Sequence, residues 1–458
     1  MKVFSDHSRP CPDRPAARAL VAGSVGNFIE WYEFGVYGYF ATVIAARFFT
    51  PEGAGAAEGL VRTYASFALA FFFRPVGAAL FGRLGDRVGR RPVLVLVIAL
   101  MTGATTLIGV LPTYAAVGAL APWLLTVLRV LQGLSAGGEF GGAVSLLTEF
   151  APPGRRGLYG AWQSFTVALG LLGGAGVAAL LATVLDAGQL ADWGWRLAFL
   201  LTLPMGIGAL WLRLRLDETP AFRSGAVREV PPAREVRRAV ALGAGRVMGW
   251  AAAGYTFLVV LPSYLQSTLD ASFQQALLAT VLANAGFAVT ILPAGLLSDR
   301  VGRRPVMLAG AALVVVLSVP LLDLLQDGGT SDTLKGVSVF GAGAVVGLMA
   351  GPGPAMLAEM FPTGVRYTGL GLAYALSNAV FSGCAGLIIT ESVRRTGNVD
   401  VPAYYAAAAC AVSALALAVT RNPAGTGSRE EADAGDRADV RDVVRRDRRG
   451  GGRSAPRG

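Results

Sequence analysis

Charged residues and histidine are scarce in this sequence of 458 residues. Only 15% of the residues are Asp, Glu, Lys or Arg, whereas a soluble protein carries about 25%. The single histidine, His7, lies in the polar N-terminal segment, which excludes imidazole as a proton carrier inside the apolar runs. The three cysteines, Cys11, Cys384 and Cys410, lack metal or redox spacing. Because two of them lie in apolar runs, we interpret them as packing residues.

Motifs typical of enzymes are also missing. The sequence has no nucleotide-binding loop, no cluster of metal ligands and no nucleophile elbow in its usual context. The glycines at 341 and 343 lie within an apolar run and not after a strand, so they do not form a dinucleotide site. Residues 1–18 lack a cleavage pattern, so we expect no signal peptide. The sequence predicts no enzymatic activity, no cofactor and no bound metal.

Apolar residues, in contrast, make up 53% of the chain. They come in runs of roughly 20 residues, the length of a membrane-spanning helix. Sixty glycines suit the close packing of helices in lipid. We therefore predict an all-α membrane protein with twelve spanning helices. By run length they lie at about 20–48, 60–81, 93–111, 115–141, 158–184, 195–213, 240–266, 274–297, 306–326, 335–357, 368–391 and 401–420.

The longest internal hydrophilic stretch separates the first six runs from the last six. The end of the chain is rich in Gly, Ala, Asp and Arg with almost no large apolar residues, so we expect a disordered tail. This tail has no apolar heptad, which argues against a coiled coil. The predicted organisation is a cytoplasmic segment over 1–19, a six-helix half over 20–213, a cytoplasmic loop over 214–239, a second half over 240–421 and a cytoplasmic tail over 422–458.

The net charge of +10 suggests nucleic-acid binding, but the positions of the basic residues argue against it. Most of them are arginines in the N-terminal segment, in alternate loops and in the tail. This asymmetry follows the positive-inside rule. It predicts an even number of spans and two cytoplasmic termini, with the lipid bilayer and not nucleic acid as the partner. No obligate protein partner is evident.

The two predicted halves repeat one another. The pattern Gly-x-Leu-x-Asp-Arg-Val-Gly-Arg-Arg-Pro occurs at 82–92 and again at 295–305, an offset of 213 residues. A second pattern, Glu-x-x-Pro-x-Gly-x-Arg, begins at Glu149 and recurs at Glu359. Repeated halves are a transporter architecture that binds substrate between the halves near the midplane of the membrane.

Two carboxylates interrupt the first apolar run. Glu30 and Glu33 are three residues apart, so on a helix they share roughly one face. An ionised carboxylate at mid-bilayer costs about 2.5–3.5 kcal/mol, which indicates either pairing with cations or proton uptake. Arg74 and Arg129 are candidate partners, and Glu139 joins them. We hypothesise that Glu30 or Glu33 accepts a coupling proton under the control of Arg129; the alternative is a permanent structural salt bridge.

Other polar and aromatic residues of the apolar runs are candidates for a substrate cavity. Each could equally be an interface anchor or a hydrogen bond between helices. Aromatic rings in a cavity suit a quaternary ammonium. An anionic substrate would need a spare arginine, and Arg74, Arg129 and Arg196 each have a plausible acid nearby, which favours a zwitterion. The cavity candidates are Asn27, Tyr37, Arg74, Gln132, Gln163, Tyr255, Asn284, Tyr374 and Asn378.

The repeated loops resemble the cytoplasmic loop motif of the major facilitator superfamily. The resemblance implies the two-half fold of that family and a tight turn that brings the aspartate against helix ends and arginines. Such a charge cluster can hold one conformation and break in the other; the alternative is that the arginines only set the topology. The predicted gating residues are Gly82, Asp86, Arg87, Gly89 and Arg90 in the first loop and Gly295, Asp299, Arg300, Gly302 and Arg303 in the second.

More of the chain, from about 20 to 420, resembles one branch of this superfamily, the metabolite:proton symporters. The pattern Asn-Phe-Ile-Glu-Trp-Tyr-Glu at 27–33 is part of this resemblance, although the branch usually has Asp where Glu33 stands. Weaker similarities at 261–265 and 401–405 point to the bacterial proline/glycine betaine transporters. The other stretches that resemble the branch are 26–34, 73–77, 129–139, 192–196, 216–222 and 359–367.

This resemblance implies a proton-coupled symporter in the inner (plasma) membrane of a bacterium that imports a small osmolyte such as proline or glycine betaine. Relatives in the same branch carry citrate, 2-oxoglutarate or shikimate, so an organic-acid symporter is the alternative. Residues 382–386 depart from the pattern of many relatives and leave the substrate open. An efflux antiporter is a second alternative, but the Gly-Pro pair usual in the fifth helix of antiporters is missing over 158–184.

Overall fold

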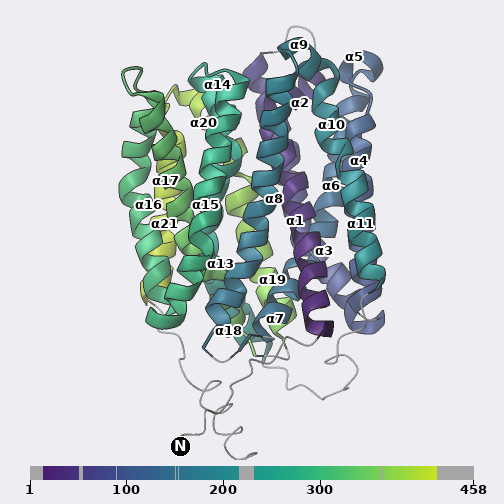
Figure 1. Cartoon of the computed structure of the whole chain (residues 1–458), viewed down its shortest axis with the longest axis vertical. Coiled ribbons are helices and arrows are strands. Elements are labelled where there is room, and N and C mark those ends of the chain that lie inside the picture. The colour runs from purple at the N-terminus through teal and green to yellow at the C-terminus, as the bar shows by residue number, and fades with distance from the viewer. Residues whose placement is uncertain are drawn as a thin grey trace, which may run out of the picture. The chain divides into compact units, whose positions relative to one another are not determined.

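The computed structural model describes residues 14–50, 55–88, 90–149, 151–152, 154–215, 232–362 and 365–419. For residues 14–23, 82–83, 85–88, 90–91, 146, 149, 367 and 419 the description covers the backbone alone. Helices fill these ranges, and no strand occurs in them (Figure 1). The predicted all-α class is therefore confirmed.

Eleven helical stretches in the described part of the chain are long and apolar enough to cross a membrane. They coincide with the second to twelfth predicted runs. The first predicted run coincides with a helix whose first ten residues are described for the backbone alone, so the total of twelve stays a prediction. The protein is a multi-pass membrane protein.

The first half contains short helical segments as well as long ones. Its elements are α1 (Arg14–Tyr39), α2 (Ala41–Ile44), η1 (Ala45–Phe49), α3 (Ala56–Val88), α4 (Arg90–Val110), α5 (Tyr114–Val117), α6 (Leu120–Ala136), α7 (Phe140–Glu149), α8 (Arg156–Val184), α9 (Ala187–Gln189), η2 (Leu190–Gly194), α10 (Trp195–Leu200) and α11 (Thr202–Leu214).

The second half also contains both long helices and short helical segments. Its elements are α13 (Ala233–Tyr255), η3 (Thr256–Val260), α14 (Leu261–Thr268), α15 (Phe273–Val301), α16 (Arg303–Gln326), α17 (Asp332–Ala350), α18 (Gly353–Glu359), α19 (Arg366–Ser377), η4 (Asn378–Gly383), α20 (Ala385–Thr396) and α21 (Val401–Val419).

Local sequence explains where several helices begin and end. Ser272 caps α15 through a reciprocal pair of hydrogen bonds with Gln275, which satisfies backbone donors at the helix start. The same helix ends at Gly302, whose φ of +95° favours a residue without Cβ. Between α17 and α18, Pro352 lacks the backbone donor that a continuous helix needs.

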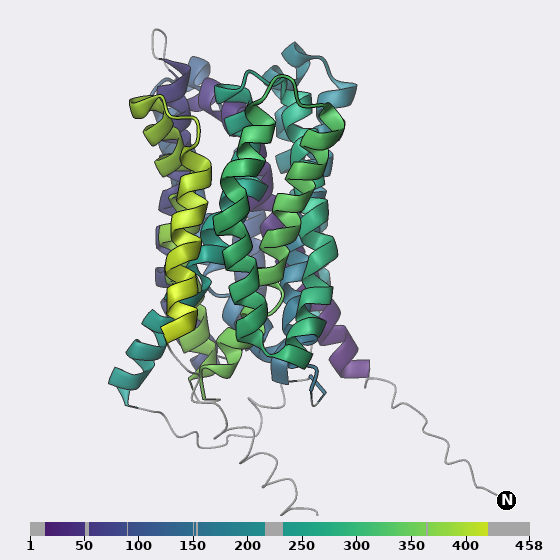
Figure 2. The ribbon, with the colours of Figure 1, turned by 90° about the vertical axis from the view of Figure 1, so that its left-hand side faces the viewer.

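Helix α13 begins about seven residues before the predicted run at 240. Pro232 precedes its first turn, where the missing N–H of proline removes no hydrogen bond within the helix, and the following Ala, Arg and Glu residues form helix readily. Figure 2 shows this first part, in teal, extending beyond its neighbours. Most of the predicted loop over 214–239, like the tail over 422–458, lies outside the described residues.

The helices as far as Ala416 form one packed unit. Helix α8 of the first half packs against α15 of the second (Figure 1). Helix α3 packs against η4 and α20. Glycines allow the second contact, since a Cβ at Gly383 would lie 2.5 Å from the side chain of Phe71. The π-helical segments η3 and η4 lie in these inter-half regions, and such segments often occur at functional sites.

Candidate functional site

A cavity of about 30 Å³ lies between the two halves. It has room for water but not for a solute the size of proline. The described residues that line it carry no charged side chain. They are Trp31, Val167, Leu171, Trp250, Ala251, Gly254, Tyr255, Leu258, Val259, Phe287, Tyr374, Asn378 and Ser382.

Aromatic rings from both halves form much of the cavity wall. Trp31 of α1 lies 6.1 Å from the ring of Tyr255 of α13, and Trp250 lies 5.8 Å from the ring of Tyr374. The hydroxyl of Tyr255 is buried and has no hydrogen-bond partner within the described ranges. Electron-rich faces turned toward one space can hold a cationic group by cation–π attraction.

Beside this wall, Glu30 of α1 pairs with Arg74 of α3 at 3.3 Å. Both side chains are buried, at 5% and 2% exposure. The guanidinium of Arg74 lies over the rings of Phe34 and Phe71, at 4.3 and 4.2 Å, and 5.5 Å from that of Trp31. The predicted pairing of a first-helix acid with Arg74 is thus present in the structure.

Arg129 does not pair with either acid of α1. Its Nη1 donates to Gln132 at 2.6 Å, and Gln132 donates in turn to the hydroxyl of Thr105 at 2.5 Å. The guanidinium packs 4.1 Å from the ring of Tyr37. No described carboxylate lies within ion-pair distance of it, which corrects the sequence-based assumption that Arg129 has an acid partner nearby.

Glu33 is fully buried, and neither of its carboxyl oxygens has a hydrogen-bond partner in the described part of the chain. The neighbouring hydroxyl of Thr105 gives its proton to the carbonyl of Met101. Glu30 and Glu33 therefore share a helix but differ in their surroundings, since of the two only Glu30 has a cation within ion-pair distance.

Glu139 pairs with Arg213 of α11, a residue that the sequence analysis overlooked. Both are buried, and Arg213 also donates to the carbonyl of Leu94 at 2.9 Å. Gly26 makes room for the pair, because a Cβ there would collide with both side chains. The signal was available, since an arginine in the last turn of a predicted span needs a partner just as Arg74 does.

The other predicted cavity residues divide into two groups. Tyr255, Tyr374 and Asn378 line the cavity. Five others form hydrogen bonds to neighbouring groups instead, which agrees with the alternative that these residues join helices. Asn27 donates to Thr166 and to the backbone carbonyl of Gln163, and the side chain of Gln163 donates to Asn27 at 3.4 Å. Tyr37 bonds Ser66, Gln132 lies between Arg129 and Thr105, and Asn284 donates to Tyr39 across the halves.

Trp31, Trp250 and Ser382 line the cavity but were not among the predicted cavity residues. Trp250 lies near the middle of its apolar run and not at a run end, where tryptophan anchors a helix in the membrane interface. That position was the available signal. Ser382 belongs to the stretch in which the sequence departs from its family pattern.

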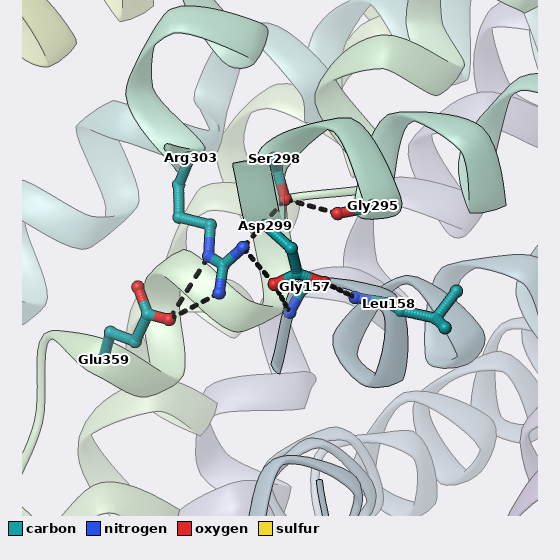
Figure 3. A network of polar contacts seen from close by, with 7 residues as sticks. All are labelled: Gly157, Leu158, Gly295, Ser298, Asp299, Arg303 and Glu359. Atoms are coloured by element: carbon teal, nitrogen blue, oxygen red, sulfur yellow. Dashed lines mark hydrogen bonds and ion pairs between the residues drawn. The ribbon is translucent and has the colours of Figure 1, made fainter. Parts of the chain in front are cut away.

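The second predicted gating loop forms a charge cluster between the halves (Figure 3). Asp299 accepts hydrogen bonds from the backbone of Gly157 and Leu158 at 2.7 and 2.9 Å. These amides lie at the start of α8, where the helix dipole attracts an anion. Arg303 donates to Asp299 at 2.6 Å and pairs with Glu359 at 3.0 Å.

The remaining gating predictions have different outcomes. Gly302 ends α15, and Gly295 faces Ala161 of α8, where a Cβ would collide. Arg300 is exposed in the last turn of α15. In the first loop, the side chains of Asp86, Arg87 and Arg90, the environment of Gly82, and Gly89 as a whole lie outside the described residues.

Neutral contacts join the halves at the opposite end of the bundle. The hydroxyl of Tyr64 bonds that of Ser263 at 2.7 Å, and Thr42 donates to Gln266 at 3.1 Å. Between this end and the Asp299 cluster, the ring of Phe140 stacks on Tyr374 at 3.5 Å. Contacts between the two halves are thus present at both ends of the bundle.

Known proteins with similar sequences share this organisation. The family model for sugar (and other) transporters matches residues 19–236, and the Major Facilitator Superfamily model matches residues 245–448. A proline/betaine transporter of Escherichia coli is 34% identical over 413 residues, which cover 86% of this chain and 81% of the relative. The chain belongs to the major facilitator superfamily.

Other members carry different solutes according to their names. An ectoine/proline transporter of Corynebacterium glutamicum is 36% identical over 427 residues, 88% of this chain and 83% of the relative. An alpha-ketoglutarate permease of Escherichia coli is 35% identical over 376 residues, 80% of this chain and 85% of the relative. The protein is accordingly a solute transporter and not an enzyme.

Solved structures agree on the fold. The crystal structure of a D-xylose-proton symporter matches with a TM-score of 0.69 and 20% identity, and the match covers 87% of this chain and 97% of that one. A second structure, of a proton:xylose symporter bound to a glucose derivative, has a TM-score of 0.72 at 18% identity and covers 88% and 94%. The family's two-half arrangement thus explains why distant segments enclose one cavity.

Proposed function

We propose that this superfamily member is a proton-coupled symporter that imports a small zwitterionic osmolyte such as proline or glycine betaine. The observation that carries this proposal is the cavity wall of Trp31, Trp250, Tyr255 and Tyr374, with no charged lining side chain among the described residues. Such a wall suits a quaternary or secondary ammonium. The names of several relatives support the same solute class.

The proton would be carried within the first half. The sequence-based candidates for coupling are Glu30, Glu33, Arg129 and Glu139, which are all buried, and one of the two acids of α1 would carry the proton. Ionisable residues inside a membrane protein are costly, and they commonly mark proton pathways. No histidine lies in the apolar runs, which leaves carboxylates as the groups that titrate there.

Alternating access would come from the two contact regions at the ends of the bundle. The Asp299 cluster closes one end with charged hydrogen bonds, and the contacts of Tyr64 and Thr42 close the other. Opening either set while the other stays closed exposes the cavity to one side at a time, as in rigid-body rocking of repeated halves. We place the Asp299 end, both termini and the loop over 214–239 in the cytoplasm of a bacterial cell with twelve spans in its plasma membrane, because the basic loops gather there.

A second candidate is an organic-acid symporter. Arg129 has no described carboxylate within ion-pair distance and two guanidinium nitrogens without hydrogen bonds, so it is the spare cation that a dicarboxylate would need. A relative named alpha-ketoglutarate permease agrees with this reading. The osmolyte is favoured because the aromatic lining of the cavity suits an ammonium group, which a dicarboxylate lacks.

Uptake into proteoliposomes tests both candidates. Purified protein is reconstituted, an inward proton gradient is imposed, and labelled glycine betaine, proline, citrate and 2-oxoglutarate are supplied in turn. We expect accumulation of betaine or proline that an uncoupler abolishes. Accumulation of 2-oxoglutarate alone would establish the second candidate, and exchange of solute outward for protons would establish an antiporter.

A further inference from the structure

We propose that the carboxylate of the substrate replaces Glu30 at Arg74, and that Glu30, once released, binds the transported proton. This inference rests on the proposed function, because it needs a substrate that carries a carboxylate. It explains why proton and solute would move together, since a single arginine serves two carboxylates in turn.

Arg74 is bound loosely enough to change partners. Its described ion pair is a contact of 3.3 Å to one oxygen of Glu30, longer than the 2.7–2.9 Å usual for a charge-assisted hydrogen bond. Its Nε is buried without a hydrogen-bond partner in the described part of the chain, and its Nη2, the atom that contacts Glu30, makes no hydrogen bond there either. A guanidinium offers five N–H donors, so a second carboxylate can be bound without breaking other hydrogen bonds of these two nitrogens.

Arg74 lies directly behind the aromatic wall of the cavity. Its guanidinium is 5.5 Å from the ring of Trp31 and 4.2 Å from that of Phe71. Phe71 in turn packs 5.3 Å from Tyr255, whose hydroxyl is free of hydrogen bonds to described residues. A zwitterion with its ammonium among the rings would therefore direct its carboxylate toward Tyr255 and Arg74.

The surroundings of Glu30 determine what happens when Arg74 leaves it. The groups that face it are Arg74, Glu139, Arg213 and the tyrosines 255 and 374, with Glu33 one turn away on the same helix. Arg213 is already held by Glu139. Glu30 would then be a buried carboxylate without a free cation, and such a group binds a proton in preference to staying charged.

The charges balance over one cycle. Before binding, Glu30 and Arg74 neutralise each other. After binding, Arg74 and the substrate carboxylate neutralise each other, the substrate ammonium is held by the rings, and Glu30 carries the proton taken from the entry side. When the substrate leaves on the other side, Arg74 returns to Glu30 and the proton departs. Each carboxylate carried therefore moves one proton and one net positive charge.

Glycine betaine and choline separate the two parts of this exchange, because both carry a trimethylammonium and only betaine carries a carboxylate. Binding to purified protein is followed at pH 8 in weak buffer with a pH indicator. We expect the wild type to take up about one proton per betaine bound and none with choline. The variant Glu30→Gln should bind betaine without proton uptake, and its affinity should not change with pH.

Arg74→Gln should weaken betaine binding by about 10- to 100-fold, the usual contribution of charge-assisted hydrogen bonds, and should change choline binding by less than about twofold. This single variant leaves Glu30 buried without its cation, which could weaken binding by itself. The double variant Glu30→Gln with Arg74→Gln therefore repeats the measurement in a site without either charge. Glu391→Gln, which alters a partly exposed acid paired with Arg394 outside the proposed site, is the matched control and should behave as wild type.

Two results would overturn the exchange: proton uptake with betaine that persists in Glu30→Gln, or equal weakening of betaine and choline in the neutral double variant. Failure of the proposed function is a separate outcome. If the wild type binds neither betaine nor proline nor choline, the substrate class is wrong. In that case 2-oxoglutarate takes the place of betaine in the same variants, and the exchange is judged by the same proton count.

Discussion

The interior of the first half and the Asp299 cluster contain the same kinds of charged residue but bond them differently. At the Asp299 cluster each carboxylate oxygen of Asp299 accepts a hydrogen bond, and Arg303 bridges two acids. In the interior, Arg74 meets Glu30 through one contact, and both oxygens of Glu33 lack partners among the described residues. Well-satisfied charges hold a conformation, whereas poorly satisfied ones can exchange partners or protons.

The sharpest test of this difference compares Glu30 with Glu33. Glu30→Gln should reduce the accumulation of substrate in proteoliposomes to a ratio of about one, because a carrier without coupling only equilibrates its solute. Glu33→Gln should keep most of the accumulation, since Glu33 has no cation to exchange and we expect it to keep its proton throughout the cycle. The reverse result would assign the coupling proton to Glu33.

The next largest effect is expected at the Glu139–Arg213 pair. Arg213→Met leaves Glu139 buried without its cation and should lower the free energy of unfolding by about 3–5 kcal/mol. Thermal unfolding in detergent measures this loss. The combined variant Glu139→Gln with Arg213→Met should recover most of it, because no unpaired charge remains. Unchanged stability of the single variant would show that water already solvates Glu139.

A smaller effect is expected at the Asp299 cluster. Asp299→Asn removes the negative charge from the start of α8 and should destabilise the closed cluster by about 1–3 kcal/mol. The expected result is greater exposure of this end, measured as faster labelling of a cysteine introduced at Ala161, with Asp323→Asn as the control. If labelling does not change, the cluster serves topology and not gating.

The smallest effect is expected at the neutral end. Tyr64→Phe removes one hydrogen bond to Ser263, for which about 0.5–1.5 kcal/mol is usual. Access from that end should increase only a few-fold, measured by labelling of a cysteine placed at Gln266. An effect as large as that of Asp299→Asn would show that the two ends hold the halves equally strongly.

Residue patterns predicted much of the candidate site. Glu30 and Glu33 interrupt an apolar run, and the structure buries both. The repeat at 295–305 predicted a charge cluster. The structure contains this cluster between Asp299 and Arg303, and Gly302 ends the helix α15 beside it. These features depend on the identity and spacing of residues that are close together in the chain, and both can be read from the sequence.

Partner choice could not be predicted in the same way. Helical spacing states which residues share a face, but not which helices meet at a given depth in the membrane. Arg129 therefore looked equivalent to Arg74, although it contacts Gln132 and Tyr37 and no described acid. For the same reason the sequence did not indicate that Arg213 pairs with Glu139, which lies 74 residues away in the chain.

The sequence by itself determined that this protein crosses the membrane with repeated helical halves and carries acids inside them, because run length, repeat and burial cost are properties of consecutive residues. Only the tertiary structure decided that Glu30 has a cation and Glu33 has none, and that Trp31 and Trp250 face one cavity. Those outcomes depend on how α1, α3 and α13 pack, and helices far apart in the chain can pack in many ways that preserve the same local pattern.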